Sequence, residues 1–238
     1  MKAKDLITFD RIIGLLGLLL SIPVFLEFWK ARVVNALLLI ILMLLVAGFL
    51  IYRRLDENRP LFTYLSVEKT LTFRDEGPHT TSQSSLVEVQ ANHTGLTQLW
   101  FRSISADGPV TNFVIDGVPV PNTLILKKAG NYEVCKQFDR ALRKGDTRKI
   151  TFSYDMLDSF PNSREGTSHA AVTITKKLKI RIEFHPNKLG REVRWFFGGG
   201  GGLEQELPPP RTLNNGSVLE VEIQDLQVGG FYTIDWVW

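Results

Sequence analysis

The sequence predicts two N-terminal transmembrane α-helices followed by an all-β domain, either a sandwich or a barrel. Two long apolar runs, residues 12–29 and 33–52, are separated only by a short basic connection. Beyond Pro60, apolar and polar residues alternate with the period of a β-strand. Turn signals divide this part of the chain into short segments, a spacing typical of sandwiches and barrels rather than of βαβ units.

Each apolar run is close to the length that a helix needs to cross a bilayer. A helix rises about 1.5 Å per residue, so about 20 residues cover about 30 Å of hydrocarbon. The connection Lys30-Ala31-Arg32 is so short that the two helices must be antiparallel neighbours. The sequence therefore predicts a membrane anchor at residues 1–59 and a separate domain at residues 60–238. A cleaved signal peptide is disfavoured, because bulky residues stand where cleavage requires small ones.

The basic residues near the two runs predict their orientation. The connection carries Lys30 and Arg32, whereas the outer ends of the runs carry Lys2, Lys4, Arg11, Arg53, Arg54 and Arg59. Basic residues are enriched on the cytoplasmic side of membrane spans. Both termini are therefore expected in the cytoplasm, with the chain passing the membrane twice.

The alternation beyond Pro60 predicts which residues face the core. The clearest case is residues 177–184, where four apolar residues alternate with Lys177, Lys179, Arg181 and Glu183. In the first strand, Leu65 and Val67 are expected to face inward together with Leu71 and Phe73. The predicted core comprises Ile150, Phe152, Leu178, Ile180, Ile182, Leu219, Val221, Ile234 and Trp236. A short helical connector is expected around Phe138, Ala141 and Leu142.

The small net charge of +3 hides an uneven distribution. Residues 136–194 hold fourteen Lys and Arg against seven Asp and Glu, whereas residues 195–238 hold one Arg against six Asp and Glu. Basic and acidic strands could pair their charges across a sheet. The basic part could instead bind an anionic partner such as a nucleotide. The sequence leaves both interpretations open.

Residues that would indicate catalysis or metal binding are scattered. The chain has one cysteine, Cys135, and its four histidines show no metal-ligand spacing. The Gly198–Gly202 run lacks the Lys-Ser/Thr pair of a phosphate-binding loop, and there is no nucleophile elbow. The sequence therefore predicts a protein that is not an enzyme and that has no cofactor, metal site or catalytic residues.

A group of basic and aromatic residues is the best candidate for a ligand site. Arg191 and Arg194 could bind phosphates through their guanidinium groups, and Phe196 could stack on a base. Lys179 and Arg181 share one face of a strand and are the next candidates. These five residues form the predicted anion-binding site.

The arrangement of two apolar runs, 12–29 and 33–52, before a strand-rich domain resembles a family of bacterial anti-phage effectors. These are the two-transmembrane, β-rich effectors of cyclic-oligonucleotide signalling systems, and the similarity is one of architecture. The C-terminal segment 231–238 (Phe-Tyr-Thr-Ile-Asp-Trp-Val-Trp) is also similar to the endings of β-sandwich modules in bacterial conflict proteins. The resemblance implies a domain that senses a cyclic oligonucleotide, and spans that assemble as a homo-oligomer to disrupt the inner membrane. It implies no DNA or RNA partner.

A second function fits the same organisation without a nucleotide. A membrane-tethered β-sandwich could bind another protein through a sheet edge or through the Gly198–Gly202 loop. The sequence itself does not choose between a nucleotide sensor and a protein interaction module.

Overall fold

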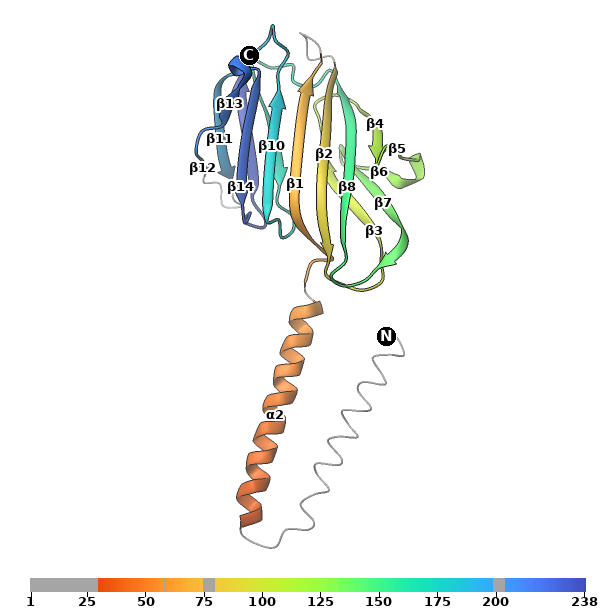
Figure 1. The fold of residues 1–238 in the computed structure, drawn as a ribbon, viewed down its shortest axis with the longest axis vertical. Helices are drawn as coiled ribbons and strands as arrows, with labels where there is room; N and C mark the ends of the chain where they lie inside the picture. Colours follow the sequence, from red (N-terminus) through yellow and green to blue (C-terminus); the bar gives the residue numbers. More distant parts are fainter. Residues whose placement is uncertain (1–29, 58, 75–79, 199–203) are drawn as a thin grey trace. The chain divides into compact units, whose positions relative to one another are not determined.

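A computed structural model describes residues 30–57, 59–74, 80–198 and 204–238 (Figure 1). The chain divides into two compact units, Met1–Arg59 and Pro60–Trp238. The first contains α2 (Lys30–Glu57), the only α-helix among the described residues. The second consists of β-strands and two short 3-10 turns, η2 (Asn122–Leu124) and η3 (Asn214–Gly216).

The prediction of two transmembrane helices is wrong for the part of the chain that the structure describes. Within that part, no helix is both long enough and apolar enough to cross a membrane. The predicted location, a double pass through the inner membrane, is overturned with it. The other predicted span, residues 12–29, lies outside the described residues.

Three sheets in two layers form the second unit. One layer is an eight-stranded sheet in the order β13-β14-β10-β1-β2-β8-β4-β5. Its strands are β1 (Phe62–Phe73), β2 (Thr80–Ala91), β4 (Val110–Ile115), β5 (Val118–Pro119), β8 (Thr147–Leu157), β10 (Lys177–Glu183), β13 (Arg211–Leu213) and β14 (Val218–Gln224). In Figure 1 this sheet faces the viewer.

The other layer contains two smaller sheets. A four-stranded sheet has the order β12-β11-β15-β9, and a three-stranded sheet has the order β3-β7-β6. Their strands are β3 (Leu96–Ile104), β6 (Ile125–Lys128), β7 (Asn131–Leu142), β9 (Arg164–Ala170), β11 (Arg191–Gly198), β12 (Glu204–Glu206) and β15 (Phe231–Val237). All three sheets contribute to one hydrophobic core. The described part of the second unit is therefore mostly β-sheet, a sandwich built from a broad sheet opposite two narrow ones, where the sequence had left a sandwich and a barrel open.

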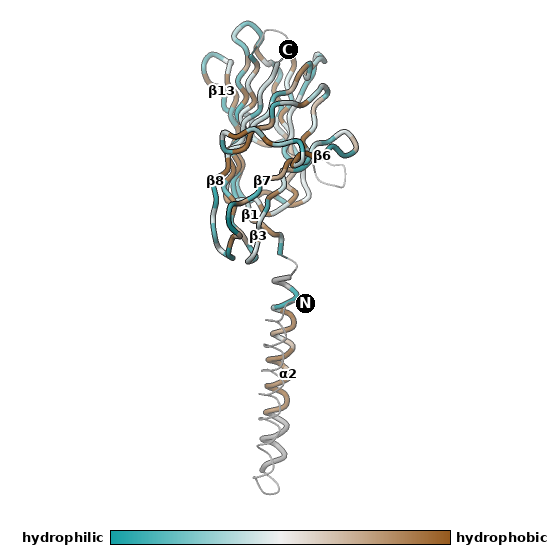
Figure 2. The backbone as a smooth tube through the Cα atoms, turned by 90° about the vertical axis from the view of Figure 1, so that its right-hand side faces the viewer, coloured by the Kyte–Doolittle hydropathy of each residue, from teal (hydrophilic) through white to brown (hydrophobic). Residues whose placement is uncertain are grey.

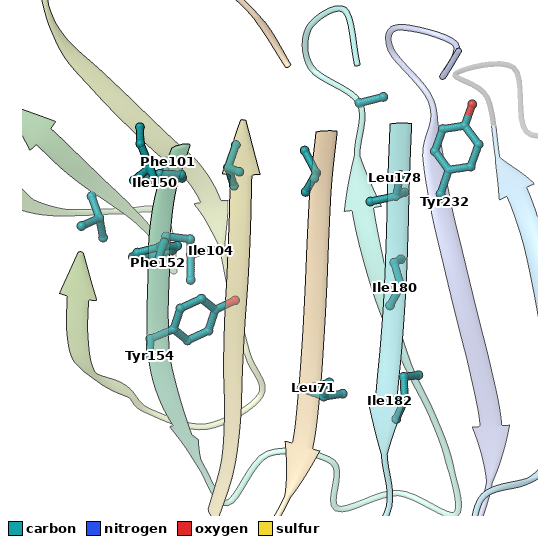
Figure 3. Packing of buried hydrophobic residues seen from close by; sticks show 14 of the residues in the cluster. Leu71, Phe101, Ile104, Ile150, Phe152, Tyr154, Leu178, Ile180, Ile182 and Tyr232 are labelled. Atoms are coloured by element: carbon teal, nitrogen blue, oxygen red, sulfur yellow. The ribbon is translucent and has the colours of Figure 1, made fainter. Parts of the chain in front are cut away.

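The predicted core is confirmed, since all nine of its residues are buried. Figure 3 shows Leu178, Ile180 and Ile182 projecting from one strand, and Figure 2 shows hydrophobic residues in strands such as β7 and β8 and hydrophilic ones in several loops. Leu65 is an exception, because a register shift between β1 and β2 at this residue reverses which side chains point inward. The predicted helical connector is also wrong, because residues 138–142 continue β7.

Gly108 is required where the chain passes close to the end of β8. A Cβ at this position would lie 1.8 Å from the backbone oxygen of Leu157, which cannot move without shifting the strand. We expect Gly108→Ala to lower the free energy of unfolding by about 1–3 kcal/mol through this overpacking. The measurement is chemical denaturation of the full chain. Gly198→Ala is the control, since no described atom lies within 4 Å of a Cβ placed there, and equal midpoints for the two variants would contradict the expectation.

Candidate functional site

A cavity of about 640 Å³ lies between the two layers of the sandwich. Its floor is the inner face of β1, β2 and β8, and its walls come from β3 and β9, the neighbouring edges of the two smaller sheets. Figure 3 shows part of the floor, with Phe152 and Tyr154 beside Phe101 and Ile104. The polar side chains that line it include Lys69, Gln83, Ser85, Arg102, Tyr154 and His169.

Lys69 stands on the floor of this cavity, at a position where a core residue is expected. Val67 and Leu71, two residues to either side on β1, are both buried, so Lys69 points to the same inner face. Across the ladders its neighbours are Ile180 on β10 and Ser85 on β2. The amino group is thus surrounded by protein, yet the cavity leaves it open to a small molecule.

Among the described residues, no carboxylate lies within ion-pair distance of the Nζ atom of Lys69. Burial lowers the pKa of Lys69 to about 8, because removing an ammonium group from water disfavours its charged form. At neutral pH the side chain is therefore still largely protonated, and it presents an unpaired positive charge to the cavity.

Other polar side chains form a band beside Lys69. Gln83 and Ser85 on β2 and Tyr154 on β8 are all buried and all line the cavity. Burial raises the pKa of Tyr154, so its hydroxyl stays protonated and can donate a hydrogen bond. A lysine ammonium, an amide and two hydroxyls on one inner face are suited to the oxygen atoms of an anionic group.

His169 approaches the cavity from β9. It is in register with the buried Tyr232 of β15. Burial, followed by the charge of Lys69, lowers the pKa of His169 to about 2, so the imidazole is neutral at physiological pH. Its Nε2 atom is buried and has no hydrogen-bond partner within the described residues. A ligand in the cavity could supply that partner.

The neutral state of His169 predicts a loss of stability in acid. The unfolded chain takes up a proton as the pH falls below about 6.5, whereas the folded chain does so only near 2. The free energy of unfolding is therefore unaffected by the protonation of His169 above about pH 6.5. Below that pH it decreases by up to about 1.4 kcal/mol per pH unit. We expect His169→Gln to flatten this slope between pH 6.5 and 4 in denaturation measurements. His185→Gln, at a loop histidine, is the control, and an equal slope in wild type and His169→Gln would contradict the assignment.

Glu165 also lines the cavity but already has a hydrogen-bond donor. Its carboxylate accepts a hydrogen bond from the backbone N–H of Asn162. Burial raises the pKa of Glu165, and the residues whose charges act on it are Asp107 and Lys188 rather than Lys69. Among the described residues, no ion pair joins this carboxylate to Lys69.

The predicted anion-binding residues on β11 lie away from this cavity. Arg194 donates two hydrogen bonds to Asp235 on β15, one of them 3.1 Å from Nε to Oδ1, and its guanidinium carbon is 5.6 Å from the centre of the Phe196 ring. Trp195 between them is buried, so Arg194 and Phe196 project from the outer face of the four-stranded sheet. Arg191, at the start of β11, is exposed.

The two predicted residues on β10 are likewise engaged by carboxylates. Arg181 donates hydrogen bonds of 2.7 Å to both Glu183 and Glu220, and Lys179 Nζ is 3.3 Å from Glu220. They project from the outer face of the eight-stranded sheet, since Ile180 between them is buried. The structure therefore does not bring the β10 and β11 residues together. Their role as ligand contacts stays a prediction, while the cross-strand charge pairing is present.

The sequence contains a signal for Lys69 that is independent of its basic clusters. Lys69 is in phase with Val67 and Leu71 in an alternating strand, so a charged residue occupies an inward position. Gln83 and Ser85 are similarly in phase with Val87 on β2. A polar residue at a core position of a strand is the pattern that identifies this site. No comparable signal marks His169.

Among the residues that the structure describes, no group of His, Cys, Asp and Glu side chains could hold a metal ion.

Comparisons with known proteins do not assign a family. No protein-family model matches the chain, and no curated protein matches it.

Solved structures that resemble the chain do so weakly. An M1 zinc metallopeptidase from Deinococcus radiodurans is 13% identical with a TM-score of 0.39, and the match covers 73% of this chain and 42% of that one. A two-domain M1 zinc metallopeptidase bound to L-tryptophan is 13% identical with a TM-score of 0.41, covering 75% and 43%. Yeast LTA4 hydrolase is 11% identical with a TM-score of 0.42, covering 73% and 29%. The chain thus matches less than half the length of each, and similarity at this level carries no argument about function.

Proposed function

We propose that residues 60–238 form a binding domain for an organic anion, which occupies the cavity and pairs with Lys69. The observation that carries this proposal is the position of Lys69 on the inner face, without a carboxylate partner among the described residues. A buried charge destabilises the folded state unless it is paired. A ligand that brings the opposite charge removes this penalty, and that gain is available only to an anion.

The size and lining of the cavity support a small organic ligand. Its volume of about 640 Å³ lies within the range of small-molecule sites, about 300–1,000 Å³. Phe101, Phe152 and Met156 provide apolar contacts, while Lys69 and Gln83 provide polar ones. This combination of apolar walls with a few convergent polar groups is typical of sites that orient a ligand by one polar end.

Carboxylates and phosphates share the chemistry that Lys69 recognises. The cyclic oligonucleotide implied by the family resemblance is one phosphate ligand of this kind, and we propose that it be tested together with simple carboxylates. A Lys ammonium binds either group as a compact point charge. The ligand screen therefore needs both classes.

Thermal denaturation of the full chain tests the proposal. Propionate, benzoate, methyl phosphate and cyclic dinucleotides are titrated against wild type, Lys69→Met and Lys149→Met, where Lys149 is an exposed lysine on β8. A ligand that binds the folded state raises its apparent stability. We expect at least one anion to raise the Tm of wild type and of Lys149→Met but not of Lys69→Met. An equal response of Lys69→Met, or no response to any anion, would overturn the proposal.

The same titration should depend on pH in a defined direction. Only the ammonium form of Lys69 attracts an anion, and its pKa in the free protein is about 8. Affinity should be constant below about pH 8 and should fall up to about tenfold per pH unit above it. Binding measured by calorimetry at pH 7 and pH 9.5 checks this. Affinity that is unchanged between the two pH values would show that Lys69 is not the contact.

A further inference from the structure

The two walls of the cavity are free strand edges. Among the described strands, β9 pairs only with β15, and β3 pairs only with β7. The cavity is lined by consecutive residues on both sides, residues 100–104 of β3 and residues 165–170 of β9. Because neighbouring residues of a strand point to opposite faces, an unbroken lining of this kind means that the strand backbones themselves border the cavity.

A gap between two strand edges suits an extended peptide. Free edges present rows of N–H and C=O groups that bind an added strand. A strand inserted here would have an edge on each side and would join the four-stranded and three-stranded sheets into one continuous layer. The inner face of β1, β2 and β8 would lie beneath it.

We propose, as an extension of the proposed function, that the anion is an Asp or Glu side chain of an extended peptide that inserts as a strand between β3 and β9. Side chains of a strand stand alternately above and below its sheet. Every second side chain of the peptide therefore faces the cavity floor, and one of them reaches Lys69. A C-terminal carboxylate would instead lie in the plane of the added sheet, away from this floor.

The lining of the cavity floor also determines which residues of the peptide should flank its Asp or Glu. On one side, the polar residues Lys69, Gln83 and Ser85 are bordered by Val67 and Val87. The opposite border is formed by the buried, apolar Met156 and Phe160. The complementary peptide has an acidic residue at one inward position and apolar residues two positions before and after it.

Peptide binding to the purified full chain tests this inference. The probe is acetyl-Thr-Val-Thr-Glu-Thr-Val-Thr-amide, with Glu and both Val at alternate positions. Three comparison ligands are used: the same peptide with Gln in place of Glu, the same peptide N-methylated at the Thr residues flanking Glu, and propionate. Each is titrated by calorimetry against wild type, Lys69→Met and Lys149→Met.

We expect the probe to bind wild type and Lys149→Met at least about tenfold more tightly than propionate does, because main-chain hydrogen bonds add to the ion pair. Replacing Glu by Gln, or Lys69 by Met, should each weaken binding by about tenfold or more, with little further loss when both are changed. N-methylation should weaken it by a similar factor without altering the charge.

The outcomes separate this inference from the proposed function. If propionate and the probe bind equally in a Lys69-dependent way, the anion site stands and the inserted strand is wrong. If N-methylation has no effect, or if the Gln peptide binds as well as the Glu peptide, the strand model is likewise overturned. If neither ligand depends on Lys69, both proposals fail.

Discussion

Lys69→Met is expected to stabilise the protein at pH 7 by up to about 3.5 kcal/mol and to abolish the proposed anion binding. The pKa of Lys69 is lowered from 10.5 to about 8 by burial, and each pKa unit corresponds to about 1.4 kcal/mol between the charged and neutral forms. Methionine has a similar length and no charge, so it fills the same space beside Val67 and Ile180 without this penalty.

The pH dependence of this gain has a predictable sign. Below about pH 8, Lys69 is charged in both the folded and unfolded states, and the full penalty acts on the folded state. Between pH 8 and 10.5 the unfolded chain binds more protons than the folded one, so wild-type stability rises with pH. The advantage of Lys69→Met should therefore disappear by about pH 10.5. Urea denaturation of wild type, Lys69→Met and Lys149→Met at pH 7 and 10.5 measures it, and a destabilised Lys69→Met at pH 7 would refute the account of the site.

Trp236→Ala is expected to lower the free energy of unfolding by about 3–5 kcal/mol, the range for removing a large aromatic side chain from a core. Trp236 is 0% exposed and contacts the rings of Phe73, Phe160, Phe184 and Trp238. Its loss leaves a void at a point where both layers of the sandwich meet, since Phe73 lies on β1 and Trp236 on β15.

A matched control is available on the same strand. Phe231 is 53% exposed, so Phe231→Ala should change stability much less than Trp236→Ala does. Chemical denaturation of the full chain compares the two variants. A loss for Trp236→Ala no larger than that for Phe231→Ala would mean that the aromatic cluster does not hold the two layers together.

Strand periodicity was sufficient to predict most of the core but not its irregularities. Ile180 and Trp236 could be assigned because apolar and polar residues alternate around them without interruption. Leu65 could not, because the register shift beside it changes the phase of the strand and leaves no trace in composition. Residues 138–142 resemble a helix in their spacing, yet long-range pairing with β3 extends β7 through them. Such tertiary pairing overrides local preference.

The candidate site was harder to predict, because charge clusters in sequence need not be clusters in space. Arg181 and Arg194 stand close together in the basic stretch, but they lie on different sheets and each binds a carboxylate from another strand. Lys69 is far from that stretch and was detectable only by its phase. His169 lines the cavity because of the order of the strands in the second layer, and a single sequence does not reveal that order.

The pairing of β1 with β10 has a consequence for how the chain folds during synthesis. These strands are adjacent and parallel, with Val67 opposite Leu178, although more than a hundred residues separate them along the chain. At about 5–20 residues per second, a ribosome needs roughly 5–20 seconds to make that intervening segment. Throughout this interval one edge of β1 has no partner, so the nascent domain exposes a long strand edge to neighbouring chains. Contacts of such wide separation also slow folding, which makes this edge the place where misassembly and chaperone binding are expected to begin.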